Sequence, residues 1–351
     1  MSQYISRLAR AIKPYVPGEQ PRTERLIKLN TNENPYPPSP GVRRALQNYP
    51  YESLRLYPDP ESRDLRQALA RRHGVDPERI FVSNGSDELL ALAFLAFFDP
   101  DREFRFPDIT YSFYPVYADL FRMRAARVPL RGDFTLAAEG FYDSPGGVIF
   151  PNPNAPTGIA ADLETVASIC RHNAGAVIVD EAYAEFGGES AVGLLERFPH
   201  LLVVKTFSKS HALAGLRVGY ALGSGEMIQA LNRIKNSFNS YPLDRLAQLA
   251  AVASIEDEDY CRAMIRRVVA TRERIIPELA ALGFHCPVSA ANFVFAGHER
   301  IPGERLADLL RERGVLVRYW KAPRIENYLR ITVGTDAEMD ALTGALALIT
   351  G

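Results

Sequence analysis

Short apolar segments recur along the chain, and many of the intervals between them carry the apolar spacing of a helix, as in residues 88–98 and 163–172. The segments predicted as strands lie near residues 80, 104, 148, 177, 202 and 218. Strands that alternate with helices are typical of an α/β domain. The pattern therefore predicts a large domain with a mostly parallel sheet.

A second, smaller α/β unit is predicted at the end of the 351 residues. Its expected strands and helices are, in chain order, strand 292–296, helix 304–313, strands 315–319 and 328–333, and helix 336–349. A chain of this length has room for two domains. We therefore predict an N-terminal arm over residues 1–28 that packs with the small domain, a large domain over 29–250 and a small domain over 251–351.

Composition excludes several classes of protein. Lys and Arg number 41 against 42 for Asp and Glu, so neither nucleic acid nor an anionic membrane is an expected partner. The longest uncharged apolar run, 89–98, is about half the length of a membrane span, and a cytoplasmic location is expected. Cys170, Cys261 and Cys286 lie far apart without metal-ligand spacing, which predicts reduced thiols and no metal site.

The run VVKTFSKSHALAGLRVGY, residues 203–220, combines an apolar strand with reactive and anion-binding side chains. Lys209 follows the strand, and ligands of open α/β sheets bind at the carboxyl ends of strands, where a lysine amine can attack a carbonyl. Thr206, Ser208 and Arg217 have the donors to hold a phosphate beside it. Taken alone, the run also fits a surface lysine in a serine-rich loop.

Two further strand ends carry polar residues. Gly85, Ser86 and Asp87 lie between a strand and an apolar helix, where backbone N–H groups make an anion site, although plain helix capping would use the same residue types. Asp180 ends the apolar strand 176–179, and a buried acid there needs a cationic or donor partner. A protonated pyridine nitrogen would be such a partner, and Tyr183 would reach the phenolic oxygen of the same ring. The alternative is that Asp180 caps a helix.

Isolated residues complete the set of candidates, each with an ordinary structural alternative. Tyr111 begins an aromatic stretch that would stack on a flat ring or simply fill the core. Asn154 lies in a loop of turn formers that would present it as a donor. Tyr57 is in an exposed loop or packs under a proline turn, and Arg318 and Arg330, near two late strands, line a site or the surface.

The order of these segments resembles the fold-type I, pyridoxal phosphate-dependent aminotransferases, and within them the histidinol-phosphate aminotransferases. The resemblance covers nearly the whole chain, in the segments LNTNENPYPPSP, RLYPDP, VSNGSDELL, PNPNAPTG, VDEAY, TFSKSHALAGLRVGY and YLRITVG. One departure is visible, because the family loop commonly reads P-N-N-P-T-G and Asn154 is here followed by Ala155.

The resemblance implies a role for each candidate. Lys209 would form a Schiff base with pyridoxal 5'-phosphate and move the α-proton, Asp180 would keep the pyridine nitrogen protonated, and Tyr183 and Asn154 would contact the ring hydroxyl. Tyr111 would stack on the ring. The cofactor phosphate would be held by Gly85, Ser86, Asp87, Thr206, Ser208, Arg217 and, from the neighbouring subunit of a homodimer, Tyr57. Tyr15, Arg318 and Arg330 would bind the substrate.

The expected reaction is ping-pong transamination of histidinol phosphate with 2-oxoglutarate, giving imidazole acetol phosphate and glutamate. Arg330 would take a phosphate in one half-reaction and a carboxylate in the other. Three alternatives stay open: an aromatic amino acid aminotransferase, a threonine-phosphate decarboxylase of the same fold, and a regulatory module that senses the cofactor. A short arm and balanced charge disfavour the last.

Overall fold

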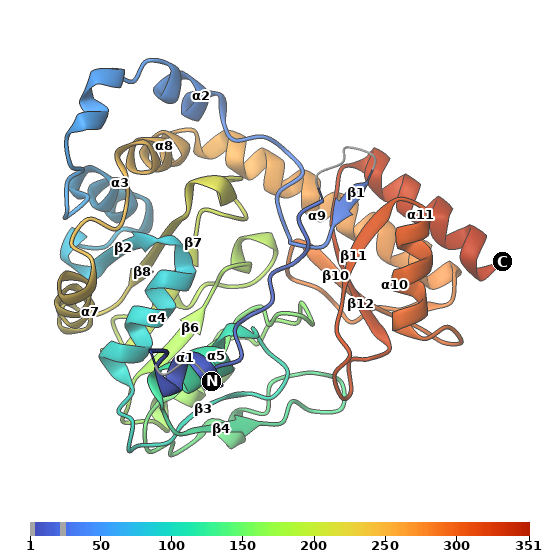
Figure 1. The fold of residues 1–351 in the computed structure, drawn as a ribbon, viewed down its shortest axis with the longest axis horizontal. Helices are drawn as coiled ribbons and strands as arrows, with labels where there is room; N and C mark the ends of the chain where they lie inside the picture. The colour runs from blue at the N-terminus through green and yellow to red at the C-terminus, as the bar shows by residue number, and fades with distance from the viewer. Residues whose placement is uncertain (1–3, 22–25) are drawn as a thin grey trace.

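A computed structural model describes residues 4–21 and 26–351, and it contains two separate sheets (Figure 1). The seven-stranded sheet has the order β2-β8-β7-β6-β5-β3-β4, and the five-stranded sheet has the order β1-β11-β12-β10-β9. The long helix α9, Glu258–Ala281, runs from the first unit to the second. The α/β prediction with a smaller C-terminal unit is confirmed.

The large sheet is parallel except for one strand. Its strands are β2 (Ile80–Asn84), β3 (Phe104–Pro107), β4 (Ala125–Val128), β5 (Val148–Pro151), β6 (Val177–Asp180), β7 (Leu201–Thr206) and β8 (Val218–Leu222). Only β8 runs antiparallel to its neighbours β7 and β2. The carboxyl ends of β5, β6 and β7 therefore meet at one edge.

Helices cover both faces of this sheet, because alternate strand residues point to opposite sides. Val177 and Val179 face one core, with α3 (Arg63–His73), α6 (Leu163–Arg171) and α8 (Arg245–Glu256). Ile178 faces the other core, with α4 (Gly85–Phe97), α5 (Phe113–Phe121) and α7 (Gly225–Phe238). Strands buried on both faces explain why the sequence shows continuous apolar runs.

The small sheet gathers strands from both ends of the chain. Its strands are β1 (Ile27–Leu29), β9 (Phe284–His285), β10 (Phe293–His298), β11 (Val315–Tyr319) and β12 (Tyr328–Thr332). β1 pairs in parallel with β11, although some 290 residues separate Ile27 from its partner Val315. Helices α9, α10 (Gly303–Glu312) and α11 (Asp336–Thr350) pack on this sheet.

The N-terminal arm crosses from one unit to the other. It contains the short helix α1 (Arg7–Ala11) and leads towards β1 in the small sheet. Helix α2 (Pro40–Gln47) then packs against α8 in the large unit. The predicted domain boundary at residue 250 falls inside α8, so we propose a boundary after residue 256. Among the described residues, no helix is long and apolar enough to span a membrane.

Candidate active site

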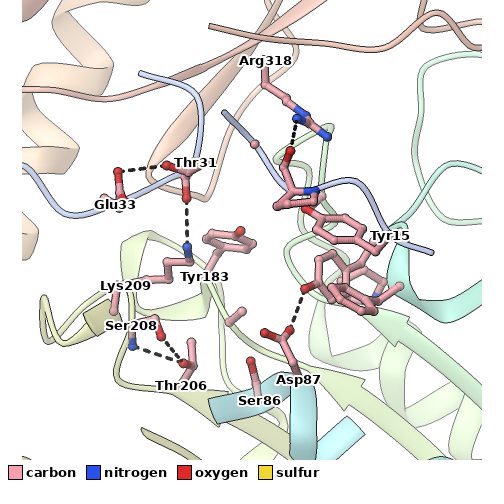
Figure 2. Close-up of a pocket in the computed structure, with 18 of the residues that line it drawn as sticks. Tyr15, Thr31, Glu33, Ser86, Asp87, Tyr183, Thr206, Ser208, Lys209 and Arg318 are labelled. Atoms are coloured by element: carbon pink, nitrogen blue, oxygen red, sulfur yellow. Dashed lines mark hydrogen bonds between the residues drawn. The ribbon is translucent and has the colours of Figure 1, made fainter. Parts of the chain in front are cut away.

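A cavity of about 370 Å³ lies where the carboxyl edge of the large sheet meets the arm and the small sheet. Figure 2 shows Lys209 and Thr206 on one side of this cavity and Arg318 across from them. Twelve of the fifteen predicted site residues line it: Tyr15, Ser86, Asp87, Tyr111, Asp180, Tyr183, Thr206, Ser208, Lys209, Arg217, Arg318 and Arg330. The structure therefore brings together residues that lie up to 315 positions apart.

Lys209 lies three residues beyond β7, with its amine in the cavity. Nζ donates to the carbonyl oxygen of Thr31 at 3.2 Å, and the Lys209 carbonyl accepts from Asn34 Nδ2 at 2.9 Å. Burial, followed by the positive charge of Arg330, lowers the pKa of Lys209 to about 8. A larger fraction of this amine is therefore unprotonated near neutral pH than of an ordinary lysine, as a nucleophile requires.

Asp180 ends β6 and is buried at the floor of the cavity. Its carboxylate accepts from the Tyr114 hydroxyl at 3.1 Å and from the Ala182 backbone N–H at 3.2 Å. Burial raises the pKa of Asp180 to about 7 in spite of these two donors. The carboxylate does not cap a helix. A buried acid that tends to bind a proton is stabilised in its charged form when a ligand places a cation beside it.

Tyr183 also lies at the floor, and a series of hydrogen bonds links its hydroxyl through Asn32 to the small unit. Its hydroxyl oxygen accepts from Asn32 Nδ2 at 3.0 Å, and Asn32 Oδ1 accepts from the Thr332 hydroxyl at 3.1 Å. Burial raises the pKa of Tyr183, so the phenol keeps its proton. Because the hydroxyl oxygen already accepts a bond, its own proton is available to a ligand oxygen.

The first turn of α4 forms an anion cradle against β8. Gly85 has φ +82°, and a Cβ there would lie 2.6 Å from Nη2 of Arg217. A Cβ on Gly219 would lie 2.4 Å from the backbone N of Ser86. The two glycines thus let the helix N-terminus, with its free N–H groups, lie directly beside Arg217. Asn84, the residue before the helix, makes no capping bond, so the plain capping alternative loses its support.

Hydroxyl and charged groups surround this cradle. The Thr206 hydroxyl donates to Ser208 Oγ at 3.1 Å, and both residues are buried. Arg217 pairs with Asp87 at 2.9 Å, and the Tyr111 hydroxyl donates to the same carboxylate at 2.7 Å. The donor set is therefore suited to a phosphate, with Asp87 fixing the guanidinium and the aromatic ring on either side.

The two arginines at the far wall have no acidic partner. Within the described part of the chain, neither Arg318 nor Arg330 has a carboxylate within ion-pair distance. Arg330 donates to the Asn30 carbonyl at 2.9 Å, and its Nε is buried without a partner. Arg318 donates to the Val16 carbonyl at 3.0 Å. A partly buried guanidinium with no carboxylate beside it favours an anionic ligand.

Asn154 is not brought to the cavity. Its Nδ2 donates to the Ile109 carbonyl at 3.1 Å and to Thr157 Oγ1 at 3.0 Å, and the side chain lies by a separate small pocket. The neighbouring Ala155 lines the main cavity instead. The structure thus gives no support to a ring contact by Asn154, because the loop turns residue 155 towards the ligand and residue 154 away from it.

Tyr57 also lies outside the cavity of its own chain. Its ring is 76% exposed and stacks on Tyr241, with ring centres 4.7 Å apart. Within one chain it cannot reach the phosphate cradle, and its predicted role depends on a second subunit. Gly85, the third predicted residue that does not line the cavity, shapes the cradle from behind.

Five residues of the site were not predicted individually: Thr31, Asn32, Glu33, Tyr114 and Trp320. The first three belong to the asparagine-rich segment 28–40, which was noted for its composition only. Glu33 lines the cavity, and the Lys28 amine and the Thr31 hydroxyl hold its carboxylate. Tyr114 is in the first turn of α5, three positions after Tyr111, which precedes the helix, and the aromatic stretch that contains both was the available signal.

Comparison with known proteins agrees with this geometry. A family model described as aminotransferase class I and II matches residues 24–346. Histidinol-phosphate aminotransferase 2 of Burkholderia mallei is 54% identical over 99% of this chain and 98% of its own length, and that of Thiobacillus denitrificans is 55% identical over 98% and 97%. The crystal structure of histidinol-phosphate aminotransferase from Sinorhizobium meliloti, in complex with pyridoxal-5'-phosphate, has a TM-score of 0.88 and 27% identity, covering 100% and 98%.

A partly buried lysine of lowered pKa, a buried carboxylate and an anion cradle at one sheet edge are typical of an enzyme that works through a reactive amine. The chain belongs to the class I and II aminotransferases. The sequence-based identification of the family is confirmed.

Proposed function

We propose that this aminotransferase transfers the amino group of histidinol phosphate to 2-oxoglutarate, giving imidazole acetol phosphate and glutamate. The observation that carries the proposal is the pair Arg318 and Arg330, two guanidiniums on one wall of the cavity that have no acidic partner among residues 4–21 and 26–351. Relatives that are 52–55% identical over nearly their whole length bear the name of this activity.

The residues at the floor fit pyridoxal 5'-phosphate as the cofactor. Lys209 would hold its aldehyde carbon, Asp180 its protonated ring nitrogen and Tyr183 its ring hydroxyl. The N–H groups of Ser86 and Asp87, with Thr206, Ser208 and Arg217, would hold its phosphate. Tyr111 would cover the ring, and Ala155, in place of the expected asparagine, lines the wall near it. The cofactor supplies an electron sink for the charge left when the α-proton is removed.

Proton movement falls to Lys209. When it is not bound to the cofactor, the Lys209 amine would lie in the cavity as a base with a lowered pKa. The Thr31 carbonyl accepts a hydrogen bond from Nζ at 3.2 Å and so orients this amine. Asp180 would stay ionised beside the protonated ring nitrogen, because a nearby positive charge favours the carboxylate form and lowers its pKa.

The substrate's anionic end would lie against the arginine wall. A phosphate dianion carries more charge than a carboxylate and needs more than one cation in a partly desolvated cleft. Arg330 would hold the phosphate of histidinol phosphate and the carboxylate of glutamate in turn, and Arg318 would assist mainly with the phosphate. Tyr15, stacked on Phe113 with ring centres 4.2 Å apart, closes the same end.

A homodimer with shared sites is part of the proposal. Tyr57 is joined on the surface by other exposed apolar side chains: Tyr51, Leu54, Leu56, Phe238 and Tyr241. A surface of this kind supports burial against a second copy of the chain. Mixing Lys209→Ala and Tyr57→Phe subunits, each impaired alone, should restore one intact site in each hybrid dimer. Activity equal to the average of the two parents would place Tyr57 outside the partner's site.

Two experiments test the proposal. Borohydride reduction followed by peptide mapping should place the pyridoxyl label on Lys209, and a label on another lysine would refute that assignment. Purified protein should then be assayed with histidinol phosphate, phenylalanine and threonine phosphate as separate donors. A preference for phenylalanine would favour an aromatic aminotransferase, and release of carbon dioxide from threonine phosphate would favour the decarboxylase.

A further inference from the structure

Arg318 and Arg330 face each other across two antiparallel strands. Their Cα atoms are register partners in β11 and β12, so both side chains project from the same face of the small sheet. Like charges directly opposite one another destabilise a sheet. The Val16 and Asn30 carbonyls each accept from one guanidinium, and a group that contacts both guanidiniums would further oppose their repulsion when no anion is bound.

Trp320 is such a group. It follows Arg318 by two positions, which places it on the same face, and its ring centre lies 5.2 Å from the guanidinium carbon of Arg318 and 5.0 Å from that of Arg330. A cation within about 6 Å of an indole ring is attracted by the negative face of the ring. Both guanidiniums thus share one aromatic contact, and Arg330 also lies 5.4 Å from the Phe293 ring.

The indole is itself held from the large unit. Arg324, in the same loop, pairs with Asp108 at 3.0 Å and donates to the backbone carbonyls of Leu130 and Arg131 at 2.9 and 2.7 Å. Trp320 packs against an apolar cluster that joins the two units and includes Ile109, Leu130, Phe134, Phe295 and Ile325. The position of the indole is therefore determined by contacts other than those with the two arginines.

We infer that Trp320 is a specificity-determining residue, which holds Arg318 beside Arg330 so that the pair meets a doubly charged phosphate rather than a single carboxylate. Arg330 has a second aromatic neighbour, Phe293, and a buried Nε, so it would keep its place without the indole. Arg318 would keep only its hydrogen bonds to the Pro17 and Val16 carbonyls of the arm, and it would be free to move away from Arg330. The loss would therefore fall on the phosphate substrate, and a carboxylate bound by Arg330 alone would be affected less.

This inference rests on the proposed function, and its kinetic test compares three variants with two donors. Trp320→Leu should raise KM for histidinol phosphate roughly tenfold, with kcat little changed and with a loss of less than about threefold for glutamate. Trp320→Phe keeps a ring and should recover most of the difference. Tyr319→Leu is the matched control, because Tyr319 is the adjacent aromatic residue and packs on the small-unit core instead of the arginines.

A second readout does not depend on turnover. Trp320 is the only tryptophan in the chain, so fluorescence excited at wavelengths where the 16 tyrosines do not absorb reports on this wall alone. Titration of the cofactor-loaded protein with inorganic phosphate should change the indole emission at lower concentrations than acetate does. Arg318→Ala should weaken that phosphate response about tenfold or more. The cofactor's own phosphate site is filled under these conditions and does not contribute.

The outcomes separate this inference from the proposed function. If histidinol phosphate is not a donor but phosphate still changes the emission and Arg318→Ala weakens the response, the proposed function fails and the anion-pairing role stands. If Trp320→Leu changes KM equally for both donors, or Trp320→Phe behaves like Trp320→Leu, the specificity role is wrong. An emission spectrum that phosphate leaves unchanged would also overturn it.

Discussion

The floor and the arginine wall of the cavity are built in different ways. The floor is made by Asp180, Tyr183, Thr206, Ser208 and Lys209, all at or just after the ends of neighbouring strands. The wall is made by Arg318 and Arg330, whose hydrogen bonds to the Val16 and Asn30 carbonyls join positions 302 and 300 residues apart. The sheet holds the floor, whereas docking of the arm holds the wall.

This difference separates chemistry from selectivity. β6 and β7 are paired residue by residue, with Asp180 opposite Val204, so the floor cannot shift without breaking the central sheet. The wall depends on an arm that contacts Arg318 through the Pro17 and Val16 carbonyls and is anchored to α10 by the pair between Glu19 and Arg311. We therefore expect substitutions in the floor to lower kcat strongly with any substrate. Substitutions in the wall should instead alter KM, by an amount that depends on the substrate's charge.

The largest effect is expected from Asp180→Asn. This change keeps the shape of the floor but removes the charge opposite the ring nitrogen, and kcat should fall about 1000-fold, which corresponds to about 4 kcal/mol. The cofactor should remain bound, since the phosphate cradle and Lys209 are intact. Absorbance of the bound cofactor and kcat with two donors check this. Near-normal turnover would contradict the assigned role.

The same carboxyl group should give the cofactor-free protein a characteristic pH dependence. The folded-state pKa of Asp180, about 7, lies above its usual value of 3.8, so between about pH 4 and pH 7 the folded state binds more protons than the unfolded state. Stability therefore falls as pH rises through that window, by up to about 4 kcal/mol. The groups facing Asp180 are Tyr114, Asp87 and Glu181, of which the two carboxylates add to the rise in pKa.

Denaturant unfolding of cofactor-free wild type and Asp180→Asn at several pH values measures this contribution. The difference in the free energy of unfolding between the two proteins should change across pH 4–7 and level off above it. Parallel curves would show that the carboxyl group ionises normally in the fold.

At the wall, Arg330→Ala should reduce kcat/KM about 100-fold for both histidinol phosphate and glutamate, because this buried cation is assigned to both half-reactions. Arg318→Ala should lower kcat/KM by roughly 10- to 100-fold for histidinol phosphate and less for glutamate or phenylalanine. Equal losses for all donors in Arg318→Ala would remove the distinction between the two arginines and favour an aromatic amino acid substrate.

The sequence predicted the floor far better than the contacts that support it. Asp180, Thr206 and Lys209 each follow a continuous apolar run, so their placement at a strand end is a local property that a linear pattern can reveal. The pairing of β1 with β11 and the reach of Asn32 to Tyr183 are non-local, and no local pattern signals them. The sequence analysis accordingly treated residues 28–40 as irregular and missed β1.

The loop after β5 shows a second limit. Its turn formers predicted a fixed loop correctly. However, side chains in a loop do not alternate regularly, so the sequence does not indicate which of them point into the cavity. The family resemblance assigned Asn154 to the ring, whereas in the structure Ala155 lines the main cavity and Asn154 lies by a separate small pocket. For Arg318 and Arg330, the sequence predicted only that both lie near late strands, and their register partnership and the position of Trp320 beside both guanidiniums required the structure.

A smaller effect on the floor is expected from Tyr114→Phe. The Tyr114 hydroxyl donates to Asp180 and favours its charged form, so its loss should lower cofactor affinity and kcat about tenfold. Tyr142→Phe is the control, because that hydroxyl bonds Ser168 far from the cavity. If both variants behave alike, the hydroxyl of Tyr114 contributes to folding only and does not act through Asp180.

The smallest effect should come from the attachment of the arm itself. Glu19 in the arm and Arg311 on α10 form a bidentate ion pair at 2.6 and 2.7 Å, but both side chains are about half exposed, and such pairs contribute about 1 kcal/mol or less. Arg311→Ala leaves every cavity residue in place and frees only one anchor. KM for histidinol phosphate should rise about two- to threefold at low salt, with kcat unchanged.

Salt gives the control for this last prediction. Because water screens an exposed pair, the difference in KM between wild type and Arg311→Ala should shrink as ionic strength rises, whereas the effect of Arg330→Ala, a buried cation, should persist. The Asn30 amide, which donates to the Glu19 carbonyl at 2.9 Å, still holds the arm in the variant. A loss in kcat rather than KM would mean that the arm positions the floor as well, and the division between a sheet-held floor and an arm-held wall would not stand.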